Sequence, residues 1–319
     1  METMPSKYEV IIVGFGPAGL TAGMYAARQG LKTLVIGVGA PGGQVLTTLK
    51  IENYPGFEVV SGKVLSILMQ RQAQKHGATL KTGDVVKLTK TKSGIAVYTD
   101  KGTKYTSKAV ILATGAKYKN LGIPGEKEFM GKGVSYCTTC DGPFFKGKTV
   151  AVVGGGNSAL TSAIYLAGLA KKVYIIHRRD EFRGADALVA QIDAKGIEKV
   201  LDSTSVEVKG DKVVTGLVVE NLKTKKKKEL PVQGVFINIG VAPSTAVAES
   251  VGVELDEEKY IKVNKNMQTN IPGVFAAGDM TGGIRQIATA VGEGCCAGLM
   301  AYKYIRSQEG KKVDVVDWD

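Results

Sequence analysis

Two stretches of the sequence share one pattern. Residues 10–37 read VIIVGFGPAGLTAGMYAARQGLKTLVIG and residues 150–177 read VAVVGGGNSALTSAIYLAGLAKKVYIIH, and the two align without a gap. Each copy begins with a short apolar run rich in β-branched residues, turns through glycines, continues with helical periodicity and ends in a second apolar run. This order predicts two strand-helix-strand units, each with parallel strands.

Each copy is followed by a meander of short strands that turn-forming residues divide. The first meander ends on the apolar strand 110–115 and the second on 235–240. A segment over 273–279 and a long helix over 285–308 follow the second meander only, so we expect them to return to the first half. The turns are expected at 92–94, 100–102, 209–211 and 221–228.

The first repeat carries a G-x-G-x-x-G pattern directly after a predicted strand. Gly14 permits a tight turn, Gly16 lets the backbone approach a pyrophosphate, and Gly19 allows the helix to pack closely on the strand. The phosphate would lie at the helix N-terminus. Gly37 stands where an acidic residue often binds the ribose, so other groups must serve that role.

The second repeat carries the G-x-G-x-x-A variant through Gly154, Gly156 and Ala159. Its second strand ends in basic residues, where an NAD-binding fold would place a carboxylate. Guanidinium groups at this position suit the 2′-phosphate of NADP. We therefore assign NADPH to the second unit, which leaves FAD for the first. The residues expected around this 2′-phosphate are His177, Arg178, Arg179 and Arg183.

The expected fold class is α/β, with two Rossmann-like dinucleotide-binding domains of three-layer ββα architecture. The length of 319 residues suits two domains. The second is expected to be inserted into the first. The FAD-binding domain would be discontinuous, covering 1–117 and 245–319, and the NADPH-binding domain would cover 118–244.

Four cysteines are too few for a secreted disulfide scaffold. Cys137 and Cys140 form a C-x-x-C pair before the second repeat, which is typical of a redox dithiol or half of a zinc site. Cys295 and Cys296 are adjacent on the predicted C-terminal helix, so their side chains diverge and cannot easily complete a zinc site. We expect redox chemistry at the first pair, small buried side chains at the second, and no metal.

The charge of the chain limits the classes of partner that it can bind. The formal charge of +12 favours anionic partners in general. The lysine run 223–228 has no interleaved aromatic residues and lies between two predicted strands, so it reads as a solvated hairpin tip, not as a nucleic-acid site. No secretion signal or membrane-spanning run is evident, and we expect a cytoplasmic protein.

Taken together, these motifs resemble the low-molecular-weight thioredoxin reductases of bacteria and archaea, in family order and over nearly the whole chain. The matching segments are GFGPAG (14–19), GGQ (42–44), ENYPG (52–56), ATG (113–115), CTTCD (137–141), GGGNSA (154–159), HRRDEFR (177–183), AGD (277–279) and RQIA (285–288).

The resemblance implies a homodimer that reduces thioredoxin or a glutaredoxin-like protein through FAD. It implies further cofactor-binding residues in each half. Those of the FAD site are Gly14, Gly16, Pro17, Ala18, Gly19, Gly42, Gly43, Gln44, Asn53, Val86, Ala113, Thr114, Gly115, Gly278, Asp279, Arg285, Gln286 and Ile287, and those of the NADPH site include Asn157 and Ser158.

The implied chemistry is a relay of electrons from NADPH through FAD to the Cys137–Cys140 disulfide, with Cys140 facing the flavin. Cys137 would attack the disulfide of the protein substrate, and Cys140 would resolve the mixed disulfide. Asp141 would transfer the proton, although a helix N-cap is its alternative role. Because dithiol and nicotinamide both need the flavin, we expect the inserted domain to rotate about 116–120 and 241–245.

The sequence departs from the family in two places. Thr161 and Ser162 stand where family members often carry two acidic residues, and Gly184 follows Arg183 where alanine is usual. The missing carboxylates weaken the argument for NADPH more than the argument for FAD. The alternative function is a flavin dithiol/disulfide oxidoreductase of the same fold that uses another electron donor.

Overall fold

A computed structural model describes residues 6–48 and 50–313. The chain divides into two compact units, one formed by 1–117 with 242–319 and the other by 118–241. The chain passes from one unit to the other within strand β9 (Ala116–Tyr118) and again within β18 (Val241–Pro243), and these two strands pair with each other.

The larger unit contains a five-stranded parallel sheet in the order β19-β8-β2-β3-β4. A second sheet, in the order β1-β7-β6-β5, contains the predicted meander. The strands of the first sheet are β2 (Val10–Val13), β3 (Thr33–Gly37), β4 (Thr79–Thr82), β8 (Ala109–Leu112) and β19 (Val274–Ala276). Those of the second are β1 (Ser6–Lys7), β5 (Val85–Thr91), β6 (Gly94–Thr99) and β7 (Lys104–Ser107).

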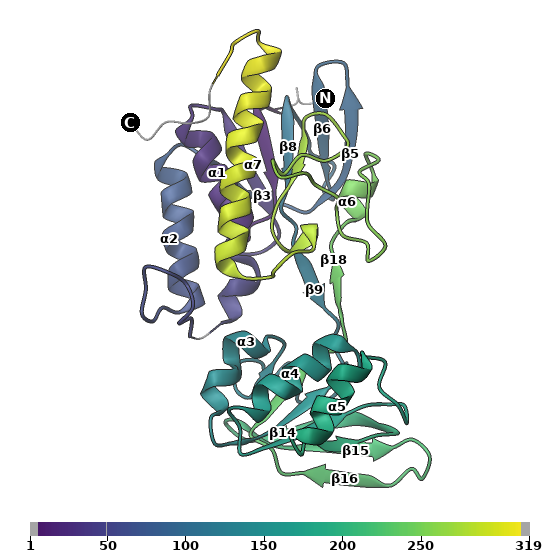
Figure 1. Cartoon of the computed structure of the whole chain (residues 1–319). Coiled ribbons are helices and arrows are strands. Elements are labelled where there is room, and N and C mark those ends of the chain that lie inside the picture. The colour runs from purple at the N-terminus through teal and green to yellow at the C-terminus, as the bar shows by residue number, and fades with distance from the viewer. Residues whose placement is uncertain (1–5, 49, 314–319) are drawn as a thin grey trace. The chain divides into compact units, whose positions relative to one another are not determined.

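Three helices lie side by side on one face of the parallel sheet, α1 (Pro17–Arg28), α2 (Gly62–Lys75) and α7 (Ile287–Gln308) (Figure 1). Neighbouring residues of the central strand serve opposite layers, because side chains alternate along a strand. Ile12 belongs to the apolar core beneath the helices, whereas Ile11 belongs to the core shared with the second sheet. This is the expected three-layer arrangement. The short helix α6 (Ala246–Glu249) follows β18.

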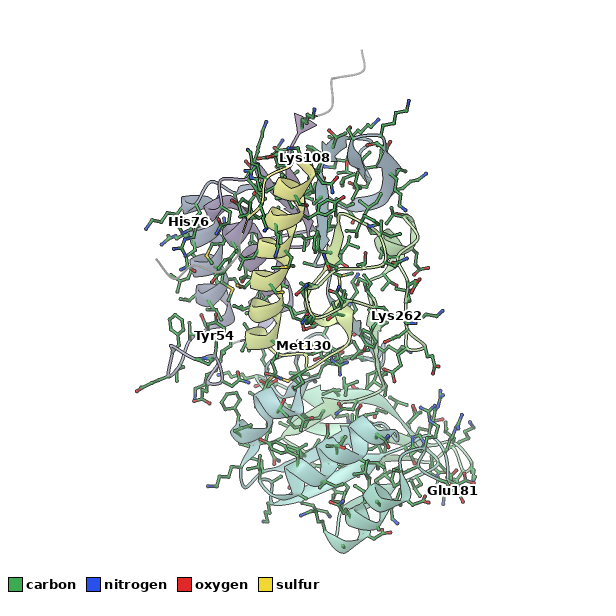
Figure 2. The ribbon with its side chains drawn as sticks, turned by 45° about the horizontal axis from the view of Figure 1, so that its top comes forward. Tyr54, His76, Lys108, Met130, Glu181 and Lys262 are labelled. Atoms are coloured by element: carbon green, nitrogen blue, oxygen red, sulfur yellow. A yellow bond between two sulfur atoms is a disulfide. The ribbon has the colours of Figure 1, made fainter. Side chains whose placement is uncertain are left out.

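The C-terminal helix α7 returns to the larger unit as expected and packs on α1. Small residues make the approach close, since a Cβ on Gly294 would lie 2.3 Å from the carbonyl oxygen of Ala18. The helix begins two residues later than predicted, at Ile287, because Gln286 is its N-cap and forms a capping box with Thr289. Lys108 lies beside its C-terminal end (Figure 2). It forms an ion pair there with Glu309.

The smaller unit repeats this plan with a parallel sheet in the order β10-β17-β11-β12-β13 and an antiparallel sheet in the order β14-β15-β16. The edge strand β10 precedes the second repeat in the chain. The strand at the same edge of the larger unit's sheet, β19, comes from the C-terminal segment. The parallel strands are β10 (Val134–Ser135), β11 (Thr149–Val153), β12 (Lys172–Ile176), β13 (Glu198–Val200) and β17 (Gly234–Ile237). The others are β14 (Ser203–Gly210), β15 (Val214–Asn221) and β16 (Lys227–Leu230).

Helices α4 (Asn157–Ala167) and α5 (Asp186–Ala194) share a buried core with one face of the parallel sheet, and the antiparallel sheet shares a core with the other. The one-turn helix α3 (Thr138–Asp141) follows β10. The α/β class and the two Rossmann-like folds are thereby confirmed. The lysine run lies mostly in the exposed turn between β15 and β16, as predicted.

Candidate functional site

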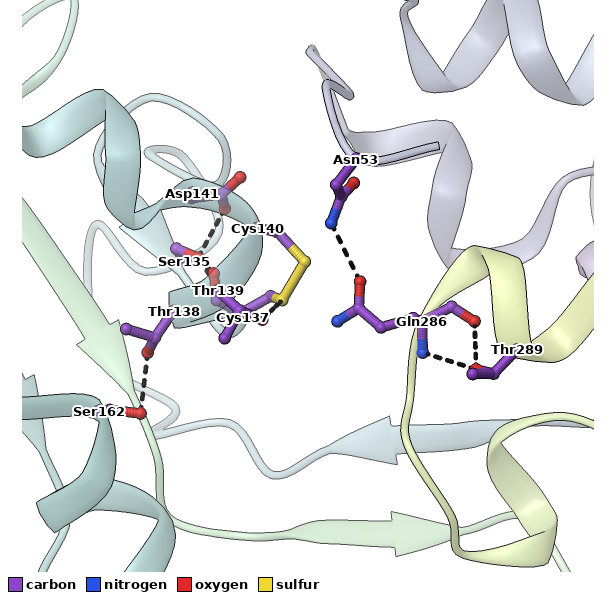
Figure 3. The surroundings of a disulfide bond; sticks show 10 residues. All are labelled: Asn53, Ser135, Cys137, Thr138, Thr139, Cys140, Asp141, Ser162, Gln286 and Thr289. Carbon is purple, nitrogen blue, oxygen red and sulfur yellow. Dashed lines mark hydrogen bonds between the residues drawn. A yellow bond between two sulfur atoms is a disulfide. The ribbon is translucent and has the colours of Figure 1, made fainter. Parts of the chain in front are cut away.

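The cysteines of the C-x-x-C motif form a disulfide in the smaller unit (Figure 3). Their Cα atoms are 5.3 Å apart, because Cys137 is the N-cap of α3 and Cys140 lies within that single helical turn. Both residues are half-buried, so the bond is sheltered and yet reachable from solvent. Strand β10 leads directly into this turn and anchors it to the parallel sheet.

Ser135, buried at the end of β10, organises the groups around the disulfide. Its Oγ donates to Asp141 Oδ2 at 2.6 Å and accepts a hydrogen bond from the backbone N–H of Cys137 at 3.1 Å (Figure 3). The serine therefore links the carboxyl group of Asp141 to the backbone of the first cysteine of the pair. Asp141 also stands at the N-cap position of the short 3-10 helix η2 (Gly142–Phe145), its alternative role, but its side chain makes no capping hydrogen bond there.

The environment of Asp141 suits a proton donor. Burial raises the pKa of Asp141 above its ordinary value, because the charged form loses hydration, and the hydrogen bond from Ser135 opposes part of that rise. A carboxyl group with a raised pKa stays protonated closer to neutral pH. It can then give a proton to a sulfur that leaves as a thiolate.

Two threonines lie between the cysteines in α3, which with its N-cap Cys137 is called the redox turn below. Thr138 Oγ1 donates to Ser162 Oγ at 2.9 Å, which ties α3 to α4 (Figure 3). The hydroxyl of Thr139 lies 3.5 Å from Cys137 Sγ, and it is the donor because a disulfide sulfur carries no hydrogen. Both of these contacts are made by neutral hydroxyl groups.

The G-x-G-x-x-G segment of the larger unit folds as the turn that it predicts. Gly14 has φ +130° and follows β2, where a Cβ would lie 2.0 Å from the carbonyl oxygen of Ala113. Gly16 is the N-cap of α1, with Pro17 at the first helical position and no side-chain cap, and Ala18 and Gly19 complete the first turn. This helix N-terminus has the form that binds phosphate in dinucleotide folds.

The predicted segment 42–44 lies beside that turn. A Cβ on Gly43 would be 3.1 Å from the Cα of Gly16, so the two backbones nearly touch. Gln44 Nε2 donates to the Ala116 carbonyl oxygen at 2.7 Å. Thr114 Oγ1 donates to the Ser244 carbonyl oxygen, and Gly115 completes that predicted segment. Segments from distant parts of the chain are thus brought together around the N-terminus of α1.

Asp279 follows β19 and is held by groups that the sequence analysis did not select. Glu293 of α7 accepts hydrogen bonds from the N–H of Gly278 at 2.7 Å and from Thr281 Oγ1 at 3.0 Å, which fixes the turn that carries Asp279. Burial raises the pKa of Asp279, Arg285 lowers it and Glu293 raises it. Arg285 is oriented by a hydrogen bond to the hydroxyl of Tyr260.

Asn53 and Gln286 meet although the sequence separates them widely. Asn53 Nδ2 donates to Gln286 Oε1 at 3.1 Å (Figure 3). Ile287 begins α7 directly after this pair. Val86 lies on β5 in the second sheet of the unit, where its side chain is 49% exposed. The FAD-site prediction therefore rests on the parallel sheet and its helices more than on Val86.

The second glycine turn matches the first. Gly154 has φ +146°, and its N–H donates to the Ile176 carbonyl oxygen. Gly156 is the N-cap of α4 without a side-chain cap, and Asn157, Ser158 and Ala159 form the first turn. Asn157 accepts a hydrogen bond from the N–H of Ala185. Two buried atoms near this turn, His177 Nε2 and Asn238 Nδ2, have no hydrogen-bond partner among the described residues.

The basic residues that follow β12 are Arg178, Arg179 and Arg183, and all three are exposed. Arg183 is brought to the glycine turn by its N–H, which donates to the Gly155 carbonyl oxygen at 2.7 Å. His177 is buried and stacks on Phe182. Burial lowers the pKa of His177, and the three arginines lower it further, so its imidazole is favoured in the neutral form. The positive charge at the end of β12 therefore comes from the arginines and not from His177.

The remaining thiols lie apart from this chemistry. Cys295 and Cys296 are free and half-buried on α7. Within residues 6–48 and 50–313, no group of three or more histidine, cysteine or acidic side chains could hold a metal ion. In the same part of the chain, no helix has both the length and the apolarity to cross a membrane.

Sequence reasoning missed Ser135 and Glu293, and it named Ser162 only as a departure from the family. Each acts through a hydrogen bond to a residue that the motifs do identify. Glu293 has a visible signal, because it is the one acidic residue of α7.

Comparisons with known proteins agree on one family. Residues 8–294 match the family model of the pyridine nucleotide-disulphide oxidoreductases. The chain is 43% identical over 302 residues to a thioredoxin reductase of Listeria monocytogenes, covering 93% of this chain and 94% of that protein. It is also 43% identical to a thioredoxin reductase of Bacillus subtilis, covering 93% and 95%. The crystal structure of thioredoxin reductase from Streptococcus pyogenes superposes with a TM-score of 0.91 at 41% identity, covering 95% of this chain and all of that one.

Proposed function

Because the chain belongs to the pyridine nucleotide-disulphide oxidoreductases and, within them, to the thioredoxin reductases, we propose that it reduces the disulfide of thioredoxin with electrons from NADPH. The observation that carries the proposal is the half-buried Cys137–Cys140 disulfide, with the Asp141 carboxyl group linked through Ser135 to the backbone of Cys137. Such a pair can cycle between disulfide and dithiol with a proton donor at hand.

The larger unit fits FAD. Its α1 N-terminus is uncapped by any side chain, and the Gly43 backbone lies against Gly16, so phosphates can reach backbone N–H groups there. Asp279, on a turn fixed by Glu293, would accept from a hydroxyl of the ribityl chain. When bound, FAD accepts a hydride equivalent from NADPH and supplies an electron pair to a disulfide.

The smaller unit fits NADPH. The second uncapped helix N-terminus and the unpartnered buried atoms of His177 and Asn238 suit a polar ligand. Arg178, Arg179 and Arg183 would bind its 2′-phosphate. These cations favour NADPH over another donor, even though Thr161 and Ser162 replace the acidic residues common in the family.

The dithiol reacts with thioredoxin in two exchanges. The Cys137 thiolate attacks one sulfur of the substrate disulfide, a bond forms between the two proteins, and the other substrate sulfur leaves as a thiolate that takes a proton from Asp141. The Cys140 thiol then gives its proton to the Asp141 carboxylate and attacks Cys137 Sγ, which restores the Cys137–Cys140 disulfide. The second substrate sulfur leaves as a thiolate and takes that proton from Asp141. The substrate gains two electrons and two protons.

A trapping experiment tests these roles. The reduced C140S variant mixed with oxidised thioredoxin should form a covalent complex whose mass is the sum of the two proteins and which dithiothreitol releases. C137S should form none, and C295S/C296S should keep wild-type turnover with NADPH and thioredoxin. A complex that forms in C137S, or turnover lost in C295S/C296S, would contradict the assignment.

We also propose that the smaller unit turns about the connectors β9 and β18 during turnover. The disulfide and the nicotinamide site belong to the same unit, and each must come within about 3–3.5 Å of one flavin to react. Cross-linking that holds Cys140 at the flavin should abolish hydride transfer from NADPH. Undiminished transfer would contradict the rotation.

The proposal includes a homodimer that acts on thioredoxin or a glutaredoxin-like protein in the cytoplasm. Free thiols at Cys295 and Cys296 suit a reducing compartment. The larger unit presents apolar side chains on and near α2, and a second copy would cover them. These are Phe57, Val59, Val64, Ile67 and Leu68. Sedimentation of the wild type should give twice the mass of one chain. The I67D/L68D variant should give the mass of a single chain.

A further inference from the structure

Glu126 is a buried acidic residue that the mechanism above does not use. Its side chain is only 2% exposed, although an isolated carboxylate is costly to bury. Three donors satisfy it: the N–H of Leu121 at 2.8 Å, the N–H of Gly122 at 2.7 Å and the hydroxyl of Tyr136 at 2.5 Å. All of these residues belong to the smaller unit.

These three donors come from two places that matter for the reaction. Leu121 and Gly122 lie just beyond β9, the first connector between the units. Tyr136 lies between Ser135, which orients Asp141, and Cys137, which attacks the substrate. One carboxylate therefore bonds the end of the connector to the residue that precedes the redox cysteine.

Further contacts reinforce the same connection. The ring of Tyr136 stacks on Tyr118 of β9, with centroids 5.1 Å apart and planes 22° apart. The Tyr136 oxygen also lies 3.1 Å from Asn120 Oδ1. Burial and the neighbouring Glu126 carboxylate raise the pKa of Tyr136, so its hydroxyl stays protonated and continues to donate.

The segment that carries Glu126 is itself firmly seated. The N–H of Val208 on β14 donates to the Pro124 carbonyl oxygen at 3.0 Å, and a Cβ on Gly125 would lie 2.1 Å from the Val208 carbonyl oxygen. Phe129, a few residues on, is part of the apolar core. Because this segment is held on both sides, the Glu126 carboxylate has little freedom to move. It therefore fixes the positions of the groups that donate to it.

We infer that Glu126 and Tyr136 are positioning residues that hold the redox turn in a fixed relation to the first connector. The inference rests on the proposed function. Through them, the backbone before Cys137 and the backbone after β9 form one rigid piece. A rotation about the connector would then carry the disulfide with it instead of being absorbed by the chain in between.

The step that uses the disulfide should depend on these residues, and the step that uses NADPH alone should not. Tyr136→Phe keeps the ring and its stacking but removes the donor to a buried charge. The loss of such a bond corresponds to about tenfold in a rate or an equilibrium. Glu126→Gln leaves one oxygen position unable to accept from a backbone N–H and should act in the same direction.

The test is rapid mixing of the flavin-loaded protein with NADPH, followed by addition of thioredoxin. In Y136F, flavin reduction by NADPH should stay within about twofold of wild type, whereas dithiol formation and kcat with thioredoxin should fall about tenfold. The KM for NADPH should be unchanged. I192A is the control, since it removes apolar packing from the other core of the same unit, to which neither Leu121 nor Tyr136 belongs.

The outcomes separate the two claims. If the wild type forms no dithiol with NADPH, the proposed function fails. If the wild type does so and Y136F matches it, or Y136F slows both steps equally, the positioning role is overturned. A selective loss of the disulfide step in I192A would overturn it as well, because general destabilisation would then explain the effect.

Discussion

The hydroxyl of Thr138 donates a hydrogen bond of 2.9 Å to the hydroxyl of Ser162. It joins the redox turn α3 to α4, the helix that follows the second glycine turn, within one unit. The relatives that the sequence resembles often carry acidic residues at 161 and 162, so here a neutral contact stands where a charge is common. A carboxylate would attract the same donor but would add a charge beside the disulfide.

Thr138→Val should remove this bond without changing the volume of the side chain. A neutral hydrogen bond contributes about 1 kcal/mol net, so a double-mutant cycle of T138V with S162A should give a coupling free energy of about that size. Denaturant unfolding of the four proteins measures it. Additive effects of the two substitutions would show that the contact contributes nothing.

Ser135→Ala should shift the pH dependence of thioredoxin reduction. The Ser135 hydrogen bond lowers the pKa of Asp141, so its removal raises that pKa further. A general acid acts while protonated, and the activity lost as pH rises should therefore be lost at higher pH in S135A. Turnover measured across the pH range tests this, and a shift toward lower pH would contradict it.

Asp141→Asn separates catalysis from stability. Turnover should fall by about a hundredfold or more, since a general acid contributes that much. Because burial raises the pKa of Asp141, its folded form binds the proton more tightly than its unfolded form. The stability this contributes is full below the unfolded value of about 3.9 and is lost as pH rises through the folded one. D141N should thus resist denaturant better than wild type at pH 8, and a less stable variant would contradict the sign.

Replacing Arg178, Arg179 or Arg183 by glutamine should weaken the binding of NADPH more than the binding of NADH. Each removes a charge-assisted bond to the 2′-phosphate, so the KM for NADPH should rise about 10- to 100-fold. The KM for NADH, which has no such phosphate, should change little. K195Q, at an exposed lysine after α5, is the matched control. Equal losses for both nucleotides would place the phosphate elsewhere.

Gly184→Ala should destabilise the protein although many relatives carry alanine. A Cβ at this position would lie 2.3 Å from Leu160 Cδ1, which is fully buried and must shift. Such overpacking costs about 1–3 kcal/mol. The double variant G184A/L160V should recover most of the loss in denaturant unfolding. No recovery would mean that Leu160 is not the obstacle.

The repeat in the sequence predicts most of the fold because its signals are local. Strands such as β2 and β11 are continuous apolar runs, and the turns after them need glycine. Strand β10 has only two residues and no periodicity to reveal it. The start of α7 was misplaced because Arg285 and Gln286 favour a helix locally, whereas the capping box begins it at Ile287.

The residues of the site also differ in how far the sequence reveals them. The cysteines, glycines and arginines are recognisable because their spacing carries the chemistry. The contacts of Ser162 and Glu126 are not recognisable from the sequence. A serine on a helix and a glutamate in a loop are common, and only the fold brings Thr138 and Tyr136 to them. Such contacts depend on burial and on distant segments, which spacing along the chain does not encode.

An anaerobic titration with NADPH tests the central claim most directly, with the flavin absorption band followed in the protein loaded with FAD and free thiols counted afterwards. The account predicts that NADPH bleaches the band, that NADH does so only at much higher concentration, and that two new thiols appear in wild type and none in C137S/C140S. A flavin that a dithiol bleaches but neither nicotinamide does would contradict NADPH as the donor, and bleaching without new thiols would contradict the Cys137–Cys140 disulfide as the acceptor.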